Sequence, residues 1–133
     1  MAELETSERT ASRQLVRFLV VGLSNTLISF VAYRLLLAGG VAYAPAALLA
    51  FVPGAVNGYV LNRRWTFAAR DTRRARVLYV MTQAAAAVSL SLLVVLLVHA
   101  GFSRVGAYVL AVPPVTLAAF TANRLWTFRV PGT

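Results

Sequence analysis

The chain has 133 residues, 59% of them hydrophobic, and its mean hydropathy is +0.72. Soluble domains use about 45–50% apolar residues, and a domain this short cannot hide the excess from water, so an ordinary soluble fold is excluded. The net charge of +9 alone would fit a nucleic-acid binder. However, its 13 basic residues, all arginine, cluster between apolar runs, which argues against nucleic acid as a partner.

The beginning of the chain predicts a short arm and not a removed leader. Residues 1–14 carry three glutamates and lack the basic stretch and cleavage site of a signal peptide. We therefore expect residues 1–16 to form a cytoplasmic arm and the first apolar run to stay in the mature protein. The absence of cysteine excludes disulfides, thiolate metal sites and cysteine nucleophiles.

Four apolar runs follow, each close to the roughly 20 residues that a helix needs to cross about 30 Å of hydrocarbon. Glycine pairs or single glycines after the first and third runs predict tight turns, and Asp71 in the longer second loop is expected to cap the third helix. The fold class is therefore all-α, two membrane-spanning hairpins in one domain. We expect that domain at 17–129, with spans at 18–38, 43–61, 77–98 and 106–122 and a tail at 130–133.

The arginines predict the orientation of these spans. Eleven lie in the arm, the second loop and the tail, whereas only Arg104 lies in the loops on the opposite side. Short loops rich in arginine face the cytoplasm. We therefore expect a multi-pass protein of the cytoplasmic (inner) membrane with both termini in the cytoplasm.

An internal repeat divides the chain into halves. The residues from Asn62 to Phe67 recur from Asn123 to Phe128, an Asn-Arg-x-Trp-Thr-Phe pattern 61 residues apart. A looser match, at an offset of 59, relates 17–21 to 76–80 and aligns Gln83 with Ser24. Two spans per half preserve orientation, so we expect parallel repeats related by an axis along the membrane normal.

These motifs resemble the GtrA-like family. The resemblance rests on the sequence Arg-Phe-Leu-Val-Val-Gly at 17–22, on Asn25 and on the motif that closes each half, and it covers about 15–129. It implies a four-span protein of cell-surface polysaccharide synthesis that moves polyprenyl-phosphate-linked monosaccharides, such as glucose or arabinose, to the outer leaflet. Similar domains are fused to membrane-bound glycosyltransferases, so it also implies a polyprenyl-phosphate glycosyltransferase as partner.

The repeated motif supplies candidate phosphate ligands. Arg63 and Arg124 stand at equivalent positions, and a guanidinium offers a planar fork that fits phosphate oxygens. Asn62 and Asn123 would donate further hydrogen bonds or brace the arginines. The motif aromatics are expected at the headgroup level, where such rings anchor helices; they are Trp65, Phe67, Trp126 and Phe128.

Polar residues inside the spans are candidate sugar ligands, because polar groups are costly in lipid and usually face a bundle interior or cavity. Those in the cytoplasmic halves of the helices are Ser24, Asn25, Asn57 and Gln83. A polar pocket there would accept a sugar. The alternative is interhelical hydrogen bonding, worth about 0.6–2 kcal/mol per bond, and both roles are compatible.

Enzymatic chemistry is not expected. Asp71 and His99 fall at opposite ends of a span, about 30 Å apart for a helix of that length, so they form neither a triad nor a metal pair. No Walker-type phosphate loop occurs, and we expect no metal, no cofactor and no catalytic residue.

Two functions remain. The first is translocation (flipping) of a polyprenyl-phosphate-linked sugar, with membrane lipids as surroundings. The alternative is a scaffold that recruits or oligomerises a glycosyltransferase without transport. Four spans enclose little volume, so either role predicts a homo-oligomer. A small proton-coupled drug exporter is disfavoured, because no Asp or Glu lies in any predicted span.

Overall fold

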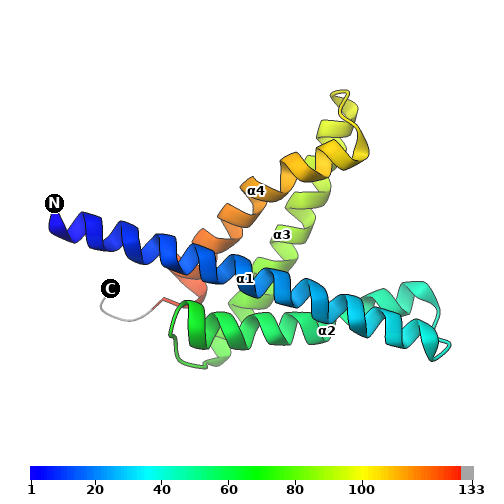
Figure 1. The fold of residues 1–133 in the computed structure, drawn as a ribbon, viewed down its shortest axis with the longest axis horizontal. Helices are drawn as coiled ribbons and strands as arrows, with labels where there is room; N and C mark the ends of the chain where they lie inside the picture. The colour runs from blue at the N-terminus through cyan, green and yellow to red at the C-terminus, as the bar shows by residue number, and fades with distance from the viewer. Residues whose placement is uncertain (130–133) are drawn as a thin grey trace. The chain divides into compact units, whose positions relative to one another are not determined.

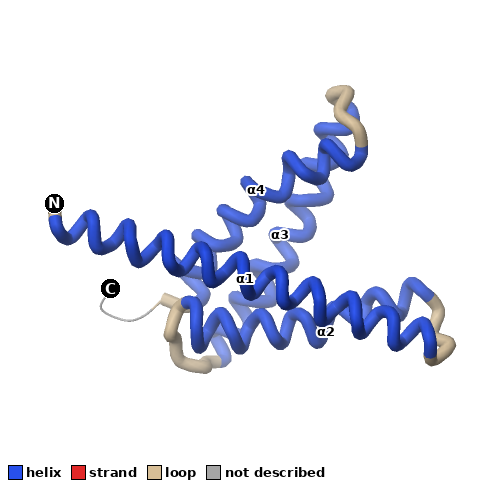
Figure 2. Tube along the Cα trace, viewed as in Figure 1, coloured by secondary structure: helices blue, strands red, loops and turns tan. Residues whose placement is uncertain are grey.

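The computed structural model describes residues 1–129, apart from the side chains of residues 43 and 44, and these residues form helices and turns with no strand (Figures 1 and 2). The all-α fold class is therefore confirmed. The tail expected at 130–133 lies outside the described residues. The α-helices are α1 (Ala2–Ala38), α2 (Tyr43–Leu61), α3 (Arg73–His99) and α4 (Arg104–Ala122).

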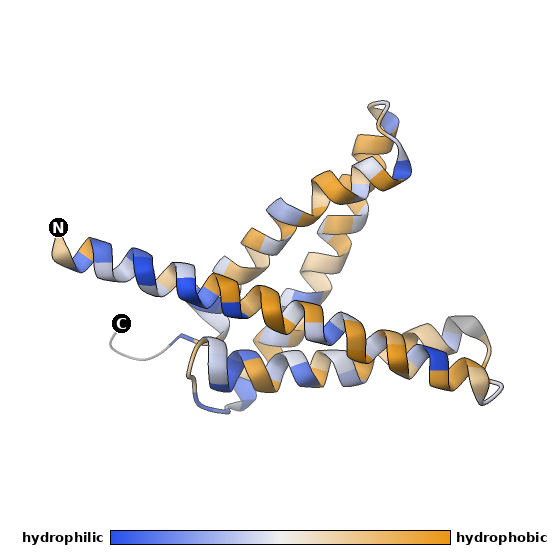
Figure 3. Cartoon of the chain, viewed as in Figure 1, coloured by the Kyte–Doolittle hydropathy of each residue, from blue (hydrophilic) through white to orange (hydrophobic). Residues whose placement is uncertain are grey.

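Each of the four helices belongs to a segment long and apolar enough to cross a membrane. The helices contain the four expected runs, and α2 begins and ends where the apolar run does. The arm at 1–16 is not a separate segment, because α1 is continuous from Ala2 through the first span. Figure 3 shows hydrophilic residues along the N-terminal part of α1 and mostly hydrophobic residues beyond it.

The chain divides into two compact units, one from Met1 to Arg70 and the other beginning at Asp71. In the first unit α1 packs against α2, and in the second α3 packs against α4. We call these units the first hairpin and the second hairpin. Two short π-helical segments, η1 (Asn62–Thr66) and η2 (Asn123–Thr127), extend α2 and α4.

The two hairpin turns are built alike. Gly40 and Gly101 have φ angles of 89° and 105°, a left-handed conformation that glycine adopts without a steric cost. At the first turn the amide of Val41 donates to the carbonyl of Leu36 (3.0 Å), and the second turn repeats this from Phe102 to Leu97 (3.1 Å). This bonding closes a helix C-terminus in the Schellman manner, so the tight turns predicted from glycine are confirmed.

The expected cap of α3 was wrong by one residue. Thr72 has an extended backbone, and its side chain accepts a hydrogen bond from the amide of Ala75 at 3.0 Å, as an N-cap does. Asp71 therefore lies outside the helix. Its carboxylate instead forms a two-bond ion pair with Arg76, at 2.6 and 2.9 Å.

The packing within each hairpin places small residues inside and large apolar residues outside. Ala46, Ala107 and Ala111 are completely buried, whereas Leu23 and Leu92 are 64% and 60% exposed. Membrane helices associate through small residues that let their backbones approach, and their large apolar side chains face lipid. This distribution fits a membrane protein.

Candidate functional site

The repeated motifs form π-helical segments at the ends of α2 and α4. The amide of Phe67 donates to the carbonyl of Asn62 at 2.8 Å, and that of Phe128 donates to the carbonyl of Asn123 at 2.9 Å. Both bonds span five residues, where an α-helix spans four. Such segments occur mostly as single turns and are frequent at functional sites. The residue sequence gave no signal for this wider helical turn.

The motif aromatics divide into two kinds. Trp65 and Trp126 are 42% and 60% exposed, as headgroup-level anchors require. Phe67 and Phe128 are buried instead. Phe67 packs on the ring of Phe18 with centroids 6.4 Å apart, and the corresponding pair of the second hairpin, Tyr79 and Phe128, has centroids 6.0 Å apart. The two phenylalanines thus hold the motif against the neighbouring helix.

These ring pairs correct the alignment of the two halves. Phe18 and Tyr79 are 61 residues apart, as are their partners Phe67 and Phe128. The looser offset of 59 was therefore wrong by two residues. Since each residue turns an α-helix by about 100°, a two-residue error places a side chain on nearly the opposite face. At the corrected offset Ser24 corresponds to Ala85, and Gln83 corresponds to Gly22.

Two arginines outside the motifs cap the π-helical segments. Arg17 donates through Nη1 to the carbonyl of Trp65 at 2.9 Å, and its guanidinium carbon lies 5.2 Å from the centre of the Trp65 ring. Arg74 donates in the same way to the carbonyl of Trp126 at 3.1 Å. The last carbonyls of a helix lack internal partners and attract cations. These arginines were expected only as orientation signals, so their capping role was missed.

Arg63 and Arg124 are half-buried in the π-helical segments. Arg63 donates through Nη1 to the carbonyl of Ala69 at 3.3 Å, and its Nε is buried with no hydrogen-bond partner. A buried donor without an acceptor is uncommon and calls for an explanation. The neighbouring Arg64 is exposed.

The motif asparagines face inward. Asn62 is 2% exposed, and its Oδ1 accepts a hydrogen bond from the hydroxyl of Thr66 at 2.9 Å. Asn123 is fully buried, and neither polar atom of its side chain has a partner. The hydroxyl of Thr127 lies 3.5 Å from that of Thr82 instead. Asn62 thus bonds within its own π-helical segment, and the two roles expected for the asparagines, donating to the ligand or bracing the arginines, stay predictions.

Three of the four polar residues expected inside the spans come together in the first hairpin. Nδ2 of Asn57 donates to Oδ1 of Asn25 at 2.7 Å and to the hydroxyl of Ser24 at 3.0 Å. All three are half-buried, and we call them the amide cluster. Gln83 belongs to the second hairpin, where its Nε2 donates to the hydroxyl of Tyr79 at 3.2 Å.

A close helix contact adjoins the amide cluster. A Cβ atom at Gly54 would lie 2.1 Å from the hydroxyl oxygen of Ser29 and 3.0 Å from the carbonyl oxygen of Asn25. An alanine there would displace the Ser29 hydroxyl and crowd the Asn25 carbonyl, so glycine allows α2 to approach α1 closely. By contrast, a Cβ atom at Gly22 would meet nothing within 4 Å. The contact between Gly54 and Ser29 was not anticipated from the sequence.

Comparison with known proteins identifies relatives across both hairpins. The family model described as GtrA/DPMS, transmembrane domain, matches residues 17–128. The chain is 36% identical over 118 residues to a protein of Bacillus subtilis (strain 168) described as the uncharacterized membrane protein YngA. That alignment covers 87% of this chain and 80% of the relative. The family match includes the amide cluster and both repeated motifs.

Proposed function

The chain belongs to the GtrA/DPMS transmembrane-domain family, and from this membership we propose that it moves a polyprenyl-phosphate-linked monosaccharide across the cytoplasmic membrane. Membership indicates involvement in polysaccharide synthesis, and the translocated lipid would supply the sugar for a cell-surface polymer. A polyprenyl-phosphate glycosyltransferase would be the partner that makes this lipid. Each hairpin encloses little volume, so the transporting unit would be a homo-oligomer.

The amide cluster is the observation that carries this proposal. Stripping water from each hydroxyl of a sugar costs about 2 kcal/mol or more when no hydrogen bond replaces it. The cluster bond joins Nδ2 of Asn57 to Oδ1 of Asn25, so among the described residues Nδ2 of Asn25 and Oδ1 of Asn57 have no partner, and both residues are half-buried. One donor and one acceptor are therefore available to a hydroxyl within an apolar span.

The position of the amide cluster along the helix also supports binding of a sugar that is joined to a phosphate. Asn57 precedes Asn62 by five residues, about 7.5 Å along a helix, so the cluster would lie just inside the headgroup region. Arg63 stands at that boundary with a buried Nε that lacks an acceptor. A phosphodiester oxygen would accept from this guanidinium while the attached sugar reaches the amides. Arg124 would do the same from the second hairpin.

The proposed transport is passive. The four acidic residues of the chain are Glu3, Glu5, Glu8 and Asp71, and none of them lies within an apolar run. A carboxylate that carries protons across the membrane would have to sit inside a span. Net flow would then follow consumption of the sugar on the far side.

Replacing the amide cluster tests the proposal. We expect the double variant Asn25→Leu with Asn57→Leu to insert and elute as the parent does, because a membrane hydrogen bond contributes only about 0.6–2 kcal/mol. In liposomes it should fail to expose a labelled polyprenyl-phosphate sugar to an impermeant reagent. The matched control is Thr26→Leu with Val56→Leu, which changes the exposed neighbours on the same helices and should transport normally.

The outcomes separate transport from scaffolding. Transport by the parent and by the control, but not by the cluster variant, supports a path along the amides. Equal transport by all three proteins means that the cluster does not line the path. If none of the three transports while each still binds the glycosyltransferase, the scaffold function replaces the proposed one.

A further inference from the structure

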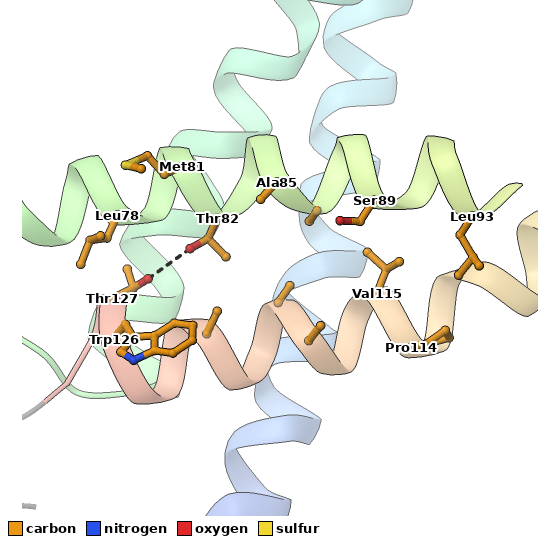
Figure 4. A pocket seen from close by; sticks show the side chains of 14 residues that line it. Leu78, Met81, Thr82, Ala85, Ser89, Leu93, Pro114, Val115, Trp126 and Thr127 are labelled. Atoms are coloured by element: carbon orange, nitrogen blue, oxygen red, sulfur yellow. Dashed lines mark hydrogen bonds between the residues drawn. The ribbon is translucent and has the colours of Figure 1, made fainter. Parts of the chain in front are cut away.

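A groove runs between α3 and α4 in the second hairpin (Figure 4). Its volume is about 570 Å³, within the range of roughly 300–1,000 Å³ that small-molecule sites occupy. Trp126 and Thr127 line one end, near η2, and Leu93 and Pro114 line the other. The groove is partly open to its surroundings.

The two hairpins carry different residues at the positions that line this groove. At the offset of 61 residues, Val115 takes the position of Gly54, whose lack of a side chain lets α2 touch α1. Small apolar residues replace the hydrogen-bonded cluster, so no side-chain hydrogen bond can join the helices at those three positions. These groove-lining residues are Ala85, Ala86 and Ala118, at the positions of Ser24, Asn25 and Asn57. In the first hairpin hydrogen bonds between side chains join the two helices at these positions, and in the second hairpin the equivalent alanines line the groove.

The shape and chemistry of the groove fit one extended apolar chain. From Leu78 to Leu93 the lining runs over 15 residues, about 22 Å along a helix, which is most of the roughly 30 Å hydrocarbon layer. Apart from the hydroxyls of Thr82, Ser89 and Thr127 and the indole N–H of Trp126, its side chains are apolar. A sugar would leave its hydroxyls without partners along such walls.

Positive charge lies near the η2 end of the groove. Arg74 donates to the carbonyl of Trp126, whose side chain lines the groove. Arginine recognises phosphate oxygens through its planar fork, so the occupant would be an apolar chain that ends in a phosphate.

We propose that this groove binds the isoprenoid chain of a polyprenyl phosphate, with the phosphate at the η2 end. A polyprenyl phosphate has one chain and one phosphate, which matches a single slot with one basic end. A diacyl phospholipid would leave its second chain outside. The alanine methyl groups along the walls also leave room for methyl branches. The inference rests on the proposed function and extends it, because it gives the lipid chain of the proposed substrate a binding site within the second hairpin.

Photolabelling of the full-length protein tests this assignment. The probe is a polyprenyl phosphate with a diazirine in its chain, incorporated into phosphatidylcholine liposomes, and labelled residues are mapped by mass spectrometry. The variant Ala85→Leu with Ala118→Leu fills the groove from both helices. Its matched control, Ala84→Leu with Ala87→Leu, adds the same bulk at exposed positions of α3 outside the lining.

We expect labelling of the parent to concentrate on the groove-lining parts of α3 and α4 and to fall about tenfold in the filled variant, which corresponds to about 1.4 kcal/mol of lost binding. The control variant should label as the parent does. Unlabelled polyprenyl phosphate should compete, and phosphatidylglycerol should not. Equal labelling of the first hairpin, no loss in the filled variant, or equal competition by phosphatidylglycerol would each overturn the assignment.

Transport measured in the same liposomes separates this inference from the proposed function. A parent that moves the sugar lipid but shows no groove labelling retains the function and loses the groove. A parent that labels in the groove but moves no lipid retains the binding site, and the function then becomes that of a scaffold which holds the lipid for its enzyme.

Discussion

Arg63 and Arg64 are neighbours in the chain but have different surroundings. Arg63 is half-buried, bonded to the carbonyl of Ala69, and has a buried Nε without a partner, whereas Arg64 is exposed. The guanidinium of Arg63 is oriented by its hydrogen bond, whereas that of Arg64 contributes only charge to the surface. Conservative substitutions at the two residues therefore distinguish whether phosphate binding needs an oriented guanidinium or positive charge alone.

We expect Arg63→Lys to lower the transport rate about tenfold, near the 1.4 kcal/mol that such a change represents, because lysine keeps the charge but loses the planar fork. Arg64→Lys should transport at the parental rate. The measurement is the initial rate of reagent access to labelled sugar lipid in liposomes. Full activity of both Arg63→Ala and Arg124→Ala, in stably inserted protein, would show that phosphate does not bind at the motifs.

The helices are the part of the fold that the sequence predicts well. The apolar run predicted both ends of α2 correctly, and Gly40 and Gly101 marked the turns, because both signals are local in the sequence. Contacts between two helices were not predictable from the sequence. The capping of Trp65 by Arg17, the contact of Gly54 with Ser29 and the correct offset of the repeats all follow from interhelical geometry.

For the candidate site too, the residue types were predictable from the sequence and the contacts between helices were not. The residue types predicted the polar members of the amide cluster, since polar groups in an apolar run are conspicuous. Their partners were not predictable, because Gln83 is as conspicuous as Asn57 yet bonds within its own helix. The groove was missed altogether, since alanines in a membrane helix give no signal until the facing helix is placed.

The close packing of α1 and α2 leads to a stability prediction. Gly54→Ala should unfold at a lower temperature in detergent, because overpacking costs about 1–3 kcal/mol, more than the roughly 1 kcal/mol that alanine gains over glycine in a helix. Gly22→Ala is the control, since its Cβ meets nothing within 4 Å. It should unfold at or above the parental temperature. Equal shifts in both variants would contradict the close contact beside the amide cluster.

At the scale of the whole molecule, the arginine distribution predicts the orientation that the proposed transport requires. Eleven arginines against one predict that both termini and the second loop lie in the cytoplasm. Reporter fusions at the C-terminus and within residues 70–76 should therefore be active as cytoplasmic reporters, and fusions near Gly40 and Gly101 as external ones. An external C-terminus would invert the proposed sites, since both motifs would then meet the lipid from the wrong leaflet.

Transport itself is the central claim, and the parent protein alone tests it most directly. Purified protein is reconstituted over a range of protein-to-lipid ratios with a labelled polyprenyl-phosphate monosaccharide and without nucleotide or ion gradient. The fraction of labelled lipid accessible to an impermeant reagent is then followed with time. We predict that access rises with the number of vesicles that contain protein and approaches completion in those vesicles. Access that never exceeds that of protein-free liposomes at any ratio would contradict the account.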